Sequence, residues 1–205
     1  MSLLSLVRPD RVGIVGHGFA ELWTPDDIAG RNLLRGERRR SNRAGRAQYC
    51  LIRGREHRLA QFVPFRNLVT QVGDQYYGER AAGISSPPNQ VSGMKLGTGT
   101  TAVAKTGAGA ALVTYTSGSH VAITATWPQS SIPSSARRIQ WKGDWAAGVA
   151  TATGLAEAVI VNEASLTNAT TAAANTIARV LLSPTINKGA SDTLSITWNH
   201  DLLGA

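Results

Sequence analysis

The sequence predicts a mainly β protein, an antiparallel β-sandwich or jelly-roll-like domain with an arginine-rich N-terminal arm of mixed or irregular structure. Three observations support this fold class. Residues 91–205 contain several short stretches in which apolar and polar residues alternate with period two. Clusters of Gly, Pro, Asn and Ser separate these stretches, without amphipathic helices between them. Positive charge is concentrated at the other end of the chain, in residues 1–66.

Five strands are predicted in the C-terminal segment. Alternation predicts residues 120–127, 138–145 and 193–200 as strands with one buried and one exposed face. Residues 157–163 and 176–183 are more continuously apolar, which is typical of central strands. Four aromatic side chains fall on the apolar faces, and we expect them in the core rather than on a sugar-stacking platform: Trp127, Trp141, Trp145 and Trp198.

Composition and charge divide the chain into three segments: a basic arm at 1–65, a linker at 66–90 and a β-sandwich domain at 91–205. Residues 1–66 hold 13 Arg, no Lys and 6 acidic residues, a net charge of +7, against +8 for the whole chain. Within the arm, Thr24 is predicted to be the N-cap of a helix, because Pro25 follows it in the first turn.

The overall composition bounds the class of protein. Of 205 residues, 42% are hydrophobic and 17% charged, which is typical of a chain that buries a core and argues against disorder or a coiled coil. The single cysteine, Cys50, excludes an internal disulfide, so stability must come from burial or from partner subunits. No apolar run approaches the ~18–20 residues of a membrane span, and we expect no membrane partner.

Two glycine-rich segments resemble nucleotide-binding loops but lack residues that such loops need. The first contains Gly16 and Gly18, but Glu21 takes the place of the third glycine and no βαβ unit follows. We interpret it as a glycine turn. In the second, Ala104 precedes Lys105, where a phosphate loop needs glycine. We therefore expect no cofactor.

Catalytic and metal-binding patterns are weak. His200 and Asp201 are adjacent, and they would contribute to an acid–base site only with a pocket and a serine beside them. Cys50 lies among arginines, which lower the pKa of a thiol, but no histidine partner is evident. No pair of histidines has the spacing of metal ligands; they are His17, His57, His120 and His200. We expect neither enzymatic activity nor a metal site.

A run of ten arginines is the strongest feature outside the β domain. Only Glu37 and Glu56 lie among them, so the local charge is +8. Guanidinium groups suit phosphates, which makes the run a candidate contact for nucleic acid or for a partner. Two alternatives stay open: an arm that is solvated or bound to an acidic protein surface, and a bias that reflects only the base composition of the gene. The arginines are Arg31, Arg35, Arg38, Arg39, Arg40, Arg43, Arg46, Arg53, Arg55 and Arg58.

Five short sequence segments after residue 66 occur in an order that is also found in a known group of proteins. They are NLVTQVGDQYY at 67–77, GMKLGTGTTA at 93–102, EAVIV at 157–161, NKGASD at 187–192 and LSITWNH at 194–200. In this order they resemble a group of small virion structural proteins of tailed bacteriophages, labelled as tail, capsid or neck proteins. The similar proteins begin near residues 63–67, so the arm is either an addition or lies before the true start of the protein.

The resemblance implies a non-enzymatic structural subunit of a tailed-phage virion, which assembles or stabilises the particle. Such a subunit is a decoration or minor capsid protein, or a component of the neck or tail. The implied partners are further copies of the chain in a homo-oligomer and other virion proteins, and the implied location is the virion, assembled in the host cytoplasm. The basic arm, which the resemblance does not cover, adds packaged DNA as a candidate partner. Two alternatives stay open: a nucleic-acid-binding protein that uses the arginine-rich arm, and a glycan-binding receptor module.

Overall fold

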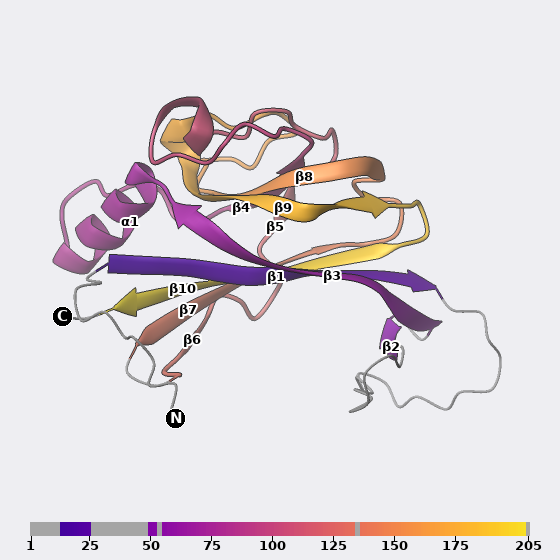
Figure 1. Cartoon of the computed structure of the whole chain (residues 1–205). Coiled ribbons are helices and arrows are strands. Elements are labelled where there is room, and N and C mark those ends of the chain that lie inside the picture. Colours follow the sequence, from indigo (N-terminus) through magenta and orange to yellow (C-terminus); the bar gives the residue numbers. More distant parts are fainter. Residues whose placement is uncertain (1–12, 26–48, 53–54, 134–135, 204–205) are drawn as a thin grey trace, which may run out of the picture.

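The computed structural model describes residues 13–25, 49–52, 55–133 and 136–203. Ten strands form one curled antiparallel sheet in the order β5-β4-β8-β9-β3-β1-β10-β7-β6, with β2 paired to β3 (Figure 1). The mainly β, antiparallel class predicted from the sequence is confirmed. The strands are β1 (Gly13–Pro25), β2 (Tyr49–Ile52), β3 (Arg55–Val69), β4 (Gly93–Gly97), β5 (Val121–Ala122), β6 (Gln129–Ser131), β7 (Arg137–Trp145), β8 (Ala152–Val161), β9 (Thr176–Lys188) and β10 (Thr193–Leu203).

The long strand β3 joins the two halves of the curled sheet. Residues 57–67 of β3 pair with β1, whereas Leu68 and Val69 pair with β9. The first half therefore contains β1, β10, β7 and β6, and the second half contains β9, β8, β4 and β5. In Figure 1 the two halves form separate layers, and β3 runs from one to the other.

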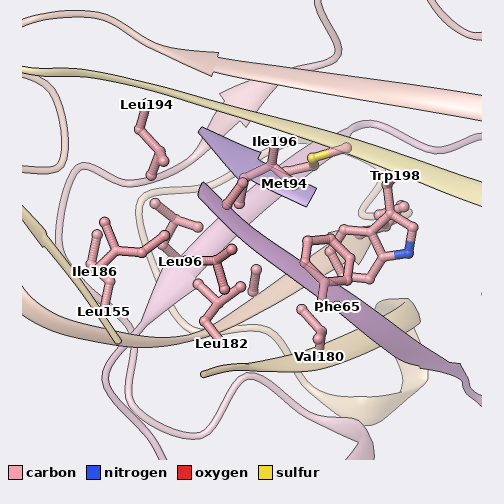
Figure 2. Close-up of a cluster of buried hydrophobic side chains, with 14 of the residues drawn as sticks. Phe65, Met94, Leu96, Leu155, Val180, Leu182, Ile186, Leu194, Ile196 and Trp198 are labelled. Atoms are coloured by element: carbon pink, nitrogen blue, oxygen red, sulfur yellow. The ribbon is translucent and has the colours of Figure 1, made fainter. Parts of the chain in front are cut away.

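The hydrophobic core lies between the two halves (Figure 2). Phe65 of β3 and Ile196 of β10 point into the core from one side. Leu96 of β4 and Leu155 of β8 point into it from the second half. The period-two pattern of a half-buried strand explains this placement, since alternate side chains of a strand point to the same face. The core position predicted for tryptophans is confirmed for three of them: Trp141, Trp145 and Trp198.

The strand predicted at residues 120–127 is largely wrong. Only Val121 and Ala122 pair, as β5. The chain then turns, because the N–H of Trp127 donates to the carbonyl of Thr124 at 3.0 Å. Trp127 is consequently partly exposed rather than in the core.

The boundary predicted between residues 65 and 66 falls inside β3, so it does not separate an arm from a linker. The segment interpreted as a glycine turn is β1, in the middle of the first half. Thr24 and Pro25 are the last residues of that strand, and the helix predicted after them lies outside the described residues. Gly16 and Gly18 occupy core-facing positions of β1. Because glycine has no apolar side chain, the alternation that would have predicted this strand is absent from the sequence.

Part of the predicted linker is the helix α1 (Gln71–Ala82), which lies at one end of the sheet (Figure 1). The N-cap is Thr70, whose hydroxyl accepts the N–H of Gly73 at 3.0 Å. The N–H of Thr70 donates to the carbonyl of Ile177 at 2.9 Å, and this bond ties the start of α1 to β9. Within the described part of the chain, no helix is long and apolar enough to cross a membrane.

Two loops, residues 98–119 and 162–175, cover the outer face of the second half. Leu112 in the first loop packs against Val159 and Val161 of β8. The loops are joined by a hydrogen bond of 3.0 Å from the N–H of Leu112 to the carbonyl of Thr171. The second half is thus covered on both faces, by the core and by the loops.

Candidate functional site

Most of the arginines predicted to contact nucleic acid or a partner lie outside the described residues. Arg55 is the first residue of β3, and Arg58 is an exposed residue of the same strand. The proposed role of the run therefore stays a prediction. The arginines outside the described residues are Arg31, Arg35, Arg38, Arg39, Arg40, Arg43, Arg46 and Arg53.

In the described part of the chain, a surface that combines polar, charged and aromatic side chains lies on the first half of the sheet. It is the face of that half that points away from the core. This surface is formed by four neighbouring strands, β3, β1, β10 and β7. Its residues alternate along each strand with residues that point into the core. We call this set the outer face: Phe62, Pro64 and Arg66 of β3, His17 and Phe19 of β1, Thr197, Asn199 and Asp201 of β10, and Arg138, Gln140 and Lys142 of β7.

A row of polar residues crosses the outer face at right angles to the strands. The register places Arg66 opposite His17, His17 opposite Asn199, and Asn199 opposite Gln140. The amide of Gln140 donates to Oδ1 of Asn199 at 2.8 Å. Directly opposite residues on one face of a sheet contact each other, so the row is a continuous polar strip.

Charges on the outer face are largely balanced. Arg138 donates from Nε and Nη2 to the two carboxylate oxygens of Asp201, at 2.6 and 2.8 Å. These bonds from Arg138 hold the pKa of Asp201 below its usual range. Nδ1 of His17 lies 3.9 Å from the same carboxylate, and partial burial lowers the pKa of His17, so this imidazole is neutral at pH 7. Lys142 pairs with Asp144 at 3.1 Å.

An aromatic pair lies beside the polar row. The rings of Phe19 and Phe62 have centroids 5.5 Å apart, and 49% of Phe62 is exposed. The exposed Pro64 lies opposite Phe19 in the register. An exposed apolar centre next to balanced polar groups is typical of a surface that binds another protein.

The acid–base pair considered at His200 and Asp201 does not come together. These residues follow each other in β10, so their side chains point to opposite faces of the sheet. His200 is fully buried, and Asp201 lies on the outer face with Arg138. The hydrogen-bond partners of His200 are not serines but Tyr77 and Asn67.

His200 connects α1 to the sheet. Oη of Tyr77 lies 2.7 Å from Nδ1 of His200, and Nδ2 of Asn67 lies 3.2 Å from Nε2. Both ring nitrogens therefore have partners inside the protein. Burial lowers the pKa of His200 to about 3, because a charged imidazole there has no water around it.

This histidine predicts an acid-sensitive fold. The pKa is about 3 in the folded protein and about 6.5 in the unfolded chain, so between these values only the unfolded chain takes up the proton. The stability is fully present above pH 6.5 and is lost as the pH falls toward 3. From pH 7 to pH 5 the loss is about 2 kcal/mol, from ~1.4 kcal/mol per pH unit. Urea unfolding monitored by tryptophan fluorescence at both pH values measures it.

Replacing His200 by glutamine distinguishes the contribution of His200 to the pH dependence from the contributions of the other titrating groups. His200→Gln is expected to be less stable than the native protein at pH 7 but to lose about 2 kcal/mol less on acidification to pH 5. His120→Gln, at a partly exposed histidine, is the matched control for replacing an imidazole by an amide. The same pH dependence in His200→Gln and the native protein would contradict the assignment.

A fully buried ion pair fixes the first covering loop on the second half. Nε and Nη2 of Arg179 in β9 donate to Oε2 of Glu157 in β8 at 3.0 and 2.7 Å. The carboxylate also accepts the N–H groups of Gly99 and Thr114, at 3.1 and 2.7 Å. Nη1 of Arg179 donates to the carbonyl of Thr101 at 2.8 Å. Both side chains have no exposed area, so the loop backbone takes the place of water around them.

A second buried pair fixes the other covering loop. Nζ of Lys95 donates to Oε1 of Glu163 at 2.6 Å and to the carbonyl of Ala169 at 2.9 Å. Burial acts to raise the pKa of Glu163, but hydrogen bonds from Lys95 and Thr171 outweigh it, and the pKa is lowered. Both buried pairs therefore position loops rather than a reactive group.

Sequence patterns missed these residues, although a signal was present. Lys95 and Glu157 are the single charged residues of their strands, and Arg179 is the single charge in the apolar stretch 177–182 of β9. A charge in a buried strand needs a partner, so these isolated charges predict buried ion pairs. The polar row offers no such signal, since it depends on the register of four strands.

Comparisons with protein-family models, with curated proteins and with solved structures found no match.

Proposed function

We propose that this protein is a non-enzymatic structural subunit of a tailed-phage virion that associates with further copies of itself and with other virion proteins. In this proposal the two facing halves of the curled sheet act as a β-sandwich. The subunit assembles or stabilises the particle as a decoration, minor capsid, neck or tail component. The observation that carries the proposal is the aromatic pair Phe19–Phe62 on the charge-balanced outer face.

The outer face has the properties of a protein–protein contact. Arg138 and Lys142 are paired within the chain, with Asp201 and Asp144, so a partner need not neutralise these two cations. Phe62 offers an apolar anchor, and the polar row that contains Asn199 and Gln140 crosses the same face. Repeated copies in a ring or shell let many small contacts of this kind act together.

The tryptophans favour this proposal over the glycan-binding alternative. A sugar-stacking platform needs several exposed aromatic faces, but four of the five tryptophans are buried and Trp127 alone is partly exposed; the buried four are Trp23, Trp141, Trp145 and Trp198. Trp145 donates from Nε1 to the carbonyl of Ser119 at 2.6 Å, as expected of a core residue.

Phe62→Ala tests the contact. Removing a central aromatic anchor is expected to weaken self-association by about 30-fold, from ~2 kcal/mol for a hot-spot residue. The fold is expected to stay intact because the ring is half-exposed. Ile84→Ala is the matched control, since Ile84 is 51% exposed but lies beyond the end of α1. Sedimentation velocity over a concentration series measures both, and equal association of Phe62→Ala and native protein would remove the outer face from the proposal.

The place in the particle needs a separate measurement. Quantitative mass spectrometry of purified virions counts the copies relative to the major capsid protein. Hundreds of copies indicate shell decoration, and the number of a single ring indicates the neck or tail. Absence of the chain from the particle would overturn the proposed function.

A further inference from the structure

The strand β6 is the last strand of the first half, and one of its edges has no partner strand in the described sheet. It pairs with β7 from Gln129 opposite Gln140 to Ser131 opposite Arg138. Figure 1 shows it at the border of its layer, and the strand order ends with it. Alternate residues of a strand direct their N–H and C=O groups to opposite edges. The outer edge of β6 therefore offers backbone hydrogen bonds to a further strand.

The segment around β6 lacks the charges that usually protect a strand edge. Residues 121–136 contain no Asp, Glu, Lys or Arg. Ile132 follows the strand and is 60% exposed, more than any other large hydrophobic side chain of the described residues. Pro128 and Pro133 lie on either side and limit pairing to a short stretch, because proline has no N–H to donate. The edge is thus open to a strand partner, but only over a few residues.

The sequence of this segment is self-complementary about Ser130. In an antiparallel pair of two β6 strands centred on Ser130, Gln129 lies opposite Ser131, and Pro128 lies opposite Ile132. Polar side chains then meet polar side chains, and each exposed isoleucine meets a proline. No like charges come together. A two-fold contact between identical copies requires self-complementarity of this kind.

We propose that β6 of one copy pairs antiparallel with β6 of a second copy, about a two-fold axis at Ser130, so that the two sheets continue into each other. The inference rests on the proposed function, because it needs copies that meet in an assembly. A strand of three residues makes few bonds, but small contacts act together when many copies are held in one particle. A two-fold contact alone gives pairs, and the outer face supplies the second contact that joins pairs into a larger assembly.

A cysteine on the axis tests this pairing in the full-length protein. Opposite residues of antiparallel strands have Cα atoms about 4.5–5.5 Å apart, which a disulfide spans. Ser130→Cys, with Cys50→Ser, is expected to form covalent dimers in more than half of the chains when dissolved oxygen oxidises it with a copper catalyst. Ser130 is exposed, and its hydroxyl accepts a long bond of 3.4 Å from Arg137, so the fold is expected to stay intact.

The neighbouring positions are matched controls for the register. In Gln129→Cys or Ser131→Cys, each with Cys50→Ser, the two identical cysteines are two residues out of register and roughly 8 Å apart, too far for a disulfide. Each variant alone is expected to stay monomeric on a non-reducing gel. An equal mixture of the two is expected to form mixed dimers, because the pairing places 129 opposite 131.

The possible outcomes separate this contact from the proposed function. Equal dimer yields from Ser130→Cys and Gln129→Cys would indicate random collisions and would overturn the pairing. Sedimentation velocity of the native protein supplies the second readout. Self-association of the native protein with no dimers from Ser130→Cys overturns the β6 contact alone. A native protein that stays monomeric, with no dimers from any variant, overturns self-association as well.

Discussion

Replacing Gly18 by valine is expected to destabilise the protein by about 3 kcal/mol or more, the upper end of what overpacking a buried site costs. The first added carbon would already lie 2.3 Å from a backbone carbonyl of β10 and 2.7 Å from the ring of Phe65. That ring cannot move aside easily, because it packs edge-on against Trp198, with centroids 5.1 Å apart. Valine therefore forces β1 away from both neighbours. Urea unfolding monitored by tryptophan fluorescence measures the loss.

A second glycine provides the control. A Cβ atom on Gly78 in α1 has no neighbour within 4 Å. Gly78→Ala is therefore expected to raise stability by about 0.5–1 kcal/mol, since alanine favours a helix more than glycine does. A loss below about 1 kcal/mol in Gly18→Val would show that the space between β1, β3 and β10 accommodates side chains.

Arg179→Met is expected to cost about 3–5 kcal/mol, because it leaves the carboxylate of Glu157 buried without its counter-ion. The loop that covers the second half is expected to loosen at the same time. Its backbone carbonyl at Thr101 loses the guanidinium donor. Chemical denaturation gives the loss of stability, and amide hydrogen exchange at Gly99 and Thr114 reports the loop.

Two further variants separate the buried charge from the loss of packing. Arg179→Met/Glu157→Gln is expected to recover part of the stability, since no unpaired charge remains. Lys105→Ala removes a pair in which both Lys105 and Asp74 are half-exposed, and it is expected to cost less than about 1 kcal/mol. Equal losses in Lys105→Ala and Arg179→Met would contradict the role given to the buried pair.

The sequence predicts strands well where hydrophobic side chains carry the period-two pattern. β7 and β10 follow from Trp141, Trp145 and Trp198, which alternate with polar residues. β1 does not, because glycines take two of its core-facing positions. Glycine is needed there because side chains of β3 lie directly over these positions: Asn67 over Gly16 and Phe65 over Gly18. These are tertiary contacts, so the local sequence contains no sign of them.

The candidate surface is less predictable than the fold. The polar row combines Arg66, His17 and Asn199, which are far apart in the chain and meet only through the strand order β3-β1-β10. Neither the alternation nor the charge of the arm indicates that order. Conversely, most of the arginine run lies outside the described residues, so its role remains a prediction from composition.

The pairing of Gly13 with Leu203 has a consequence for the timing of synthesis. β1 is the first described strand to leave the ribosome, and β10 is the last. At about 5–20 residues per second, β1 waits roughly 10–40 s for this neighbour. The first half of the sheet is therefore completed only after β10 has been synthesised, and such distant pairings fold slowly. A message truncated before codon 193 yields a chain whose β1 has one open edge and whose core lacks Leu194, Ile196 and Trp198.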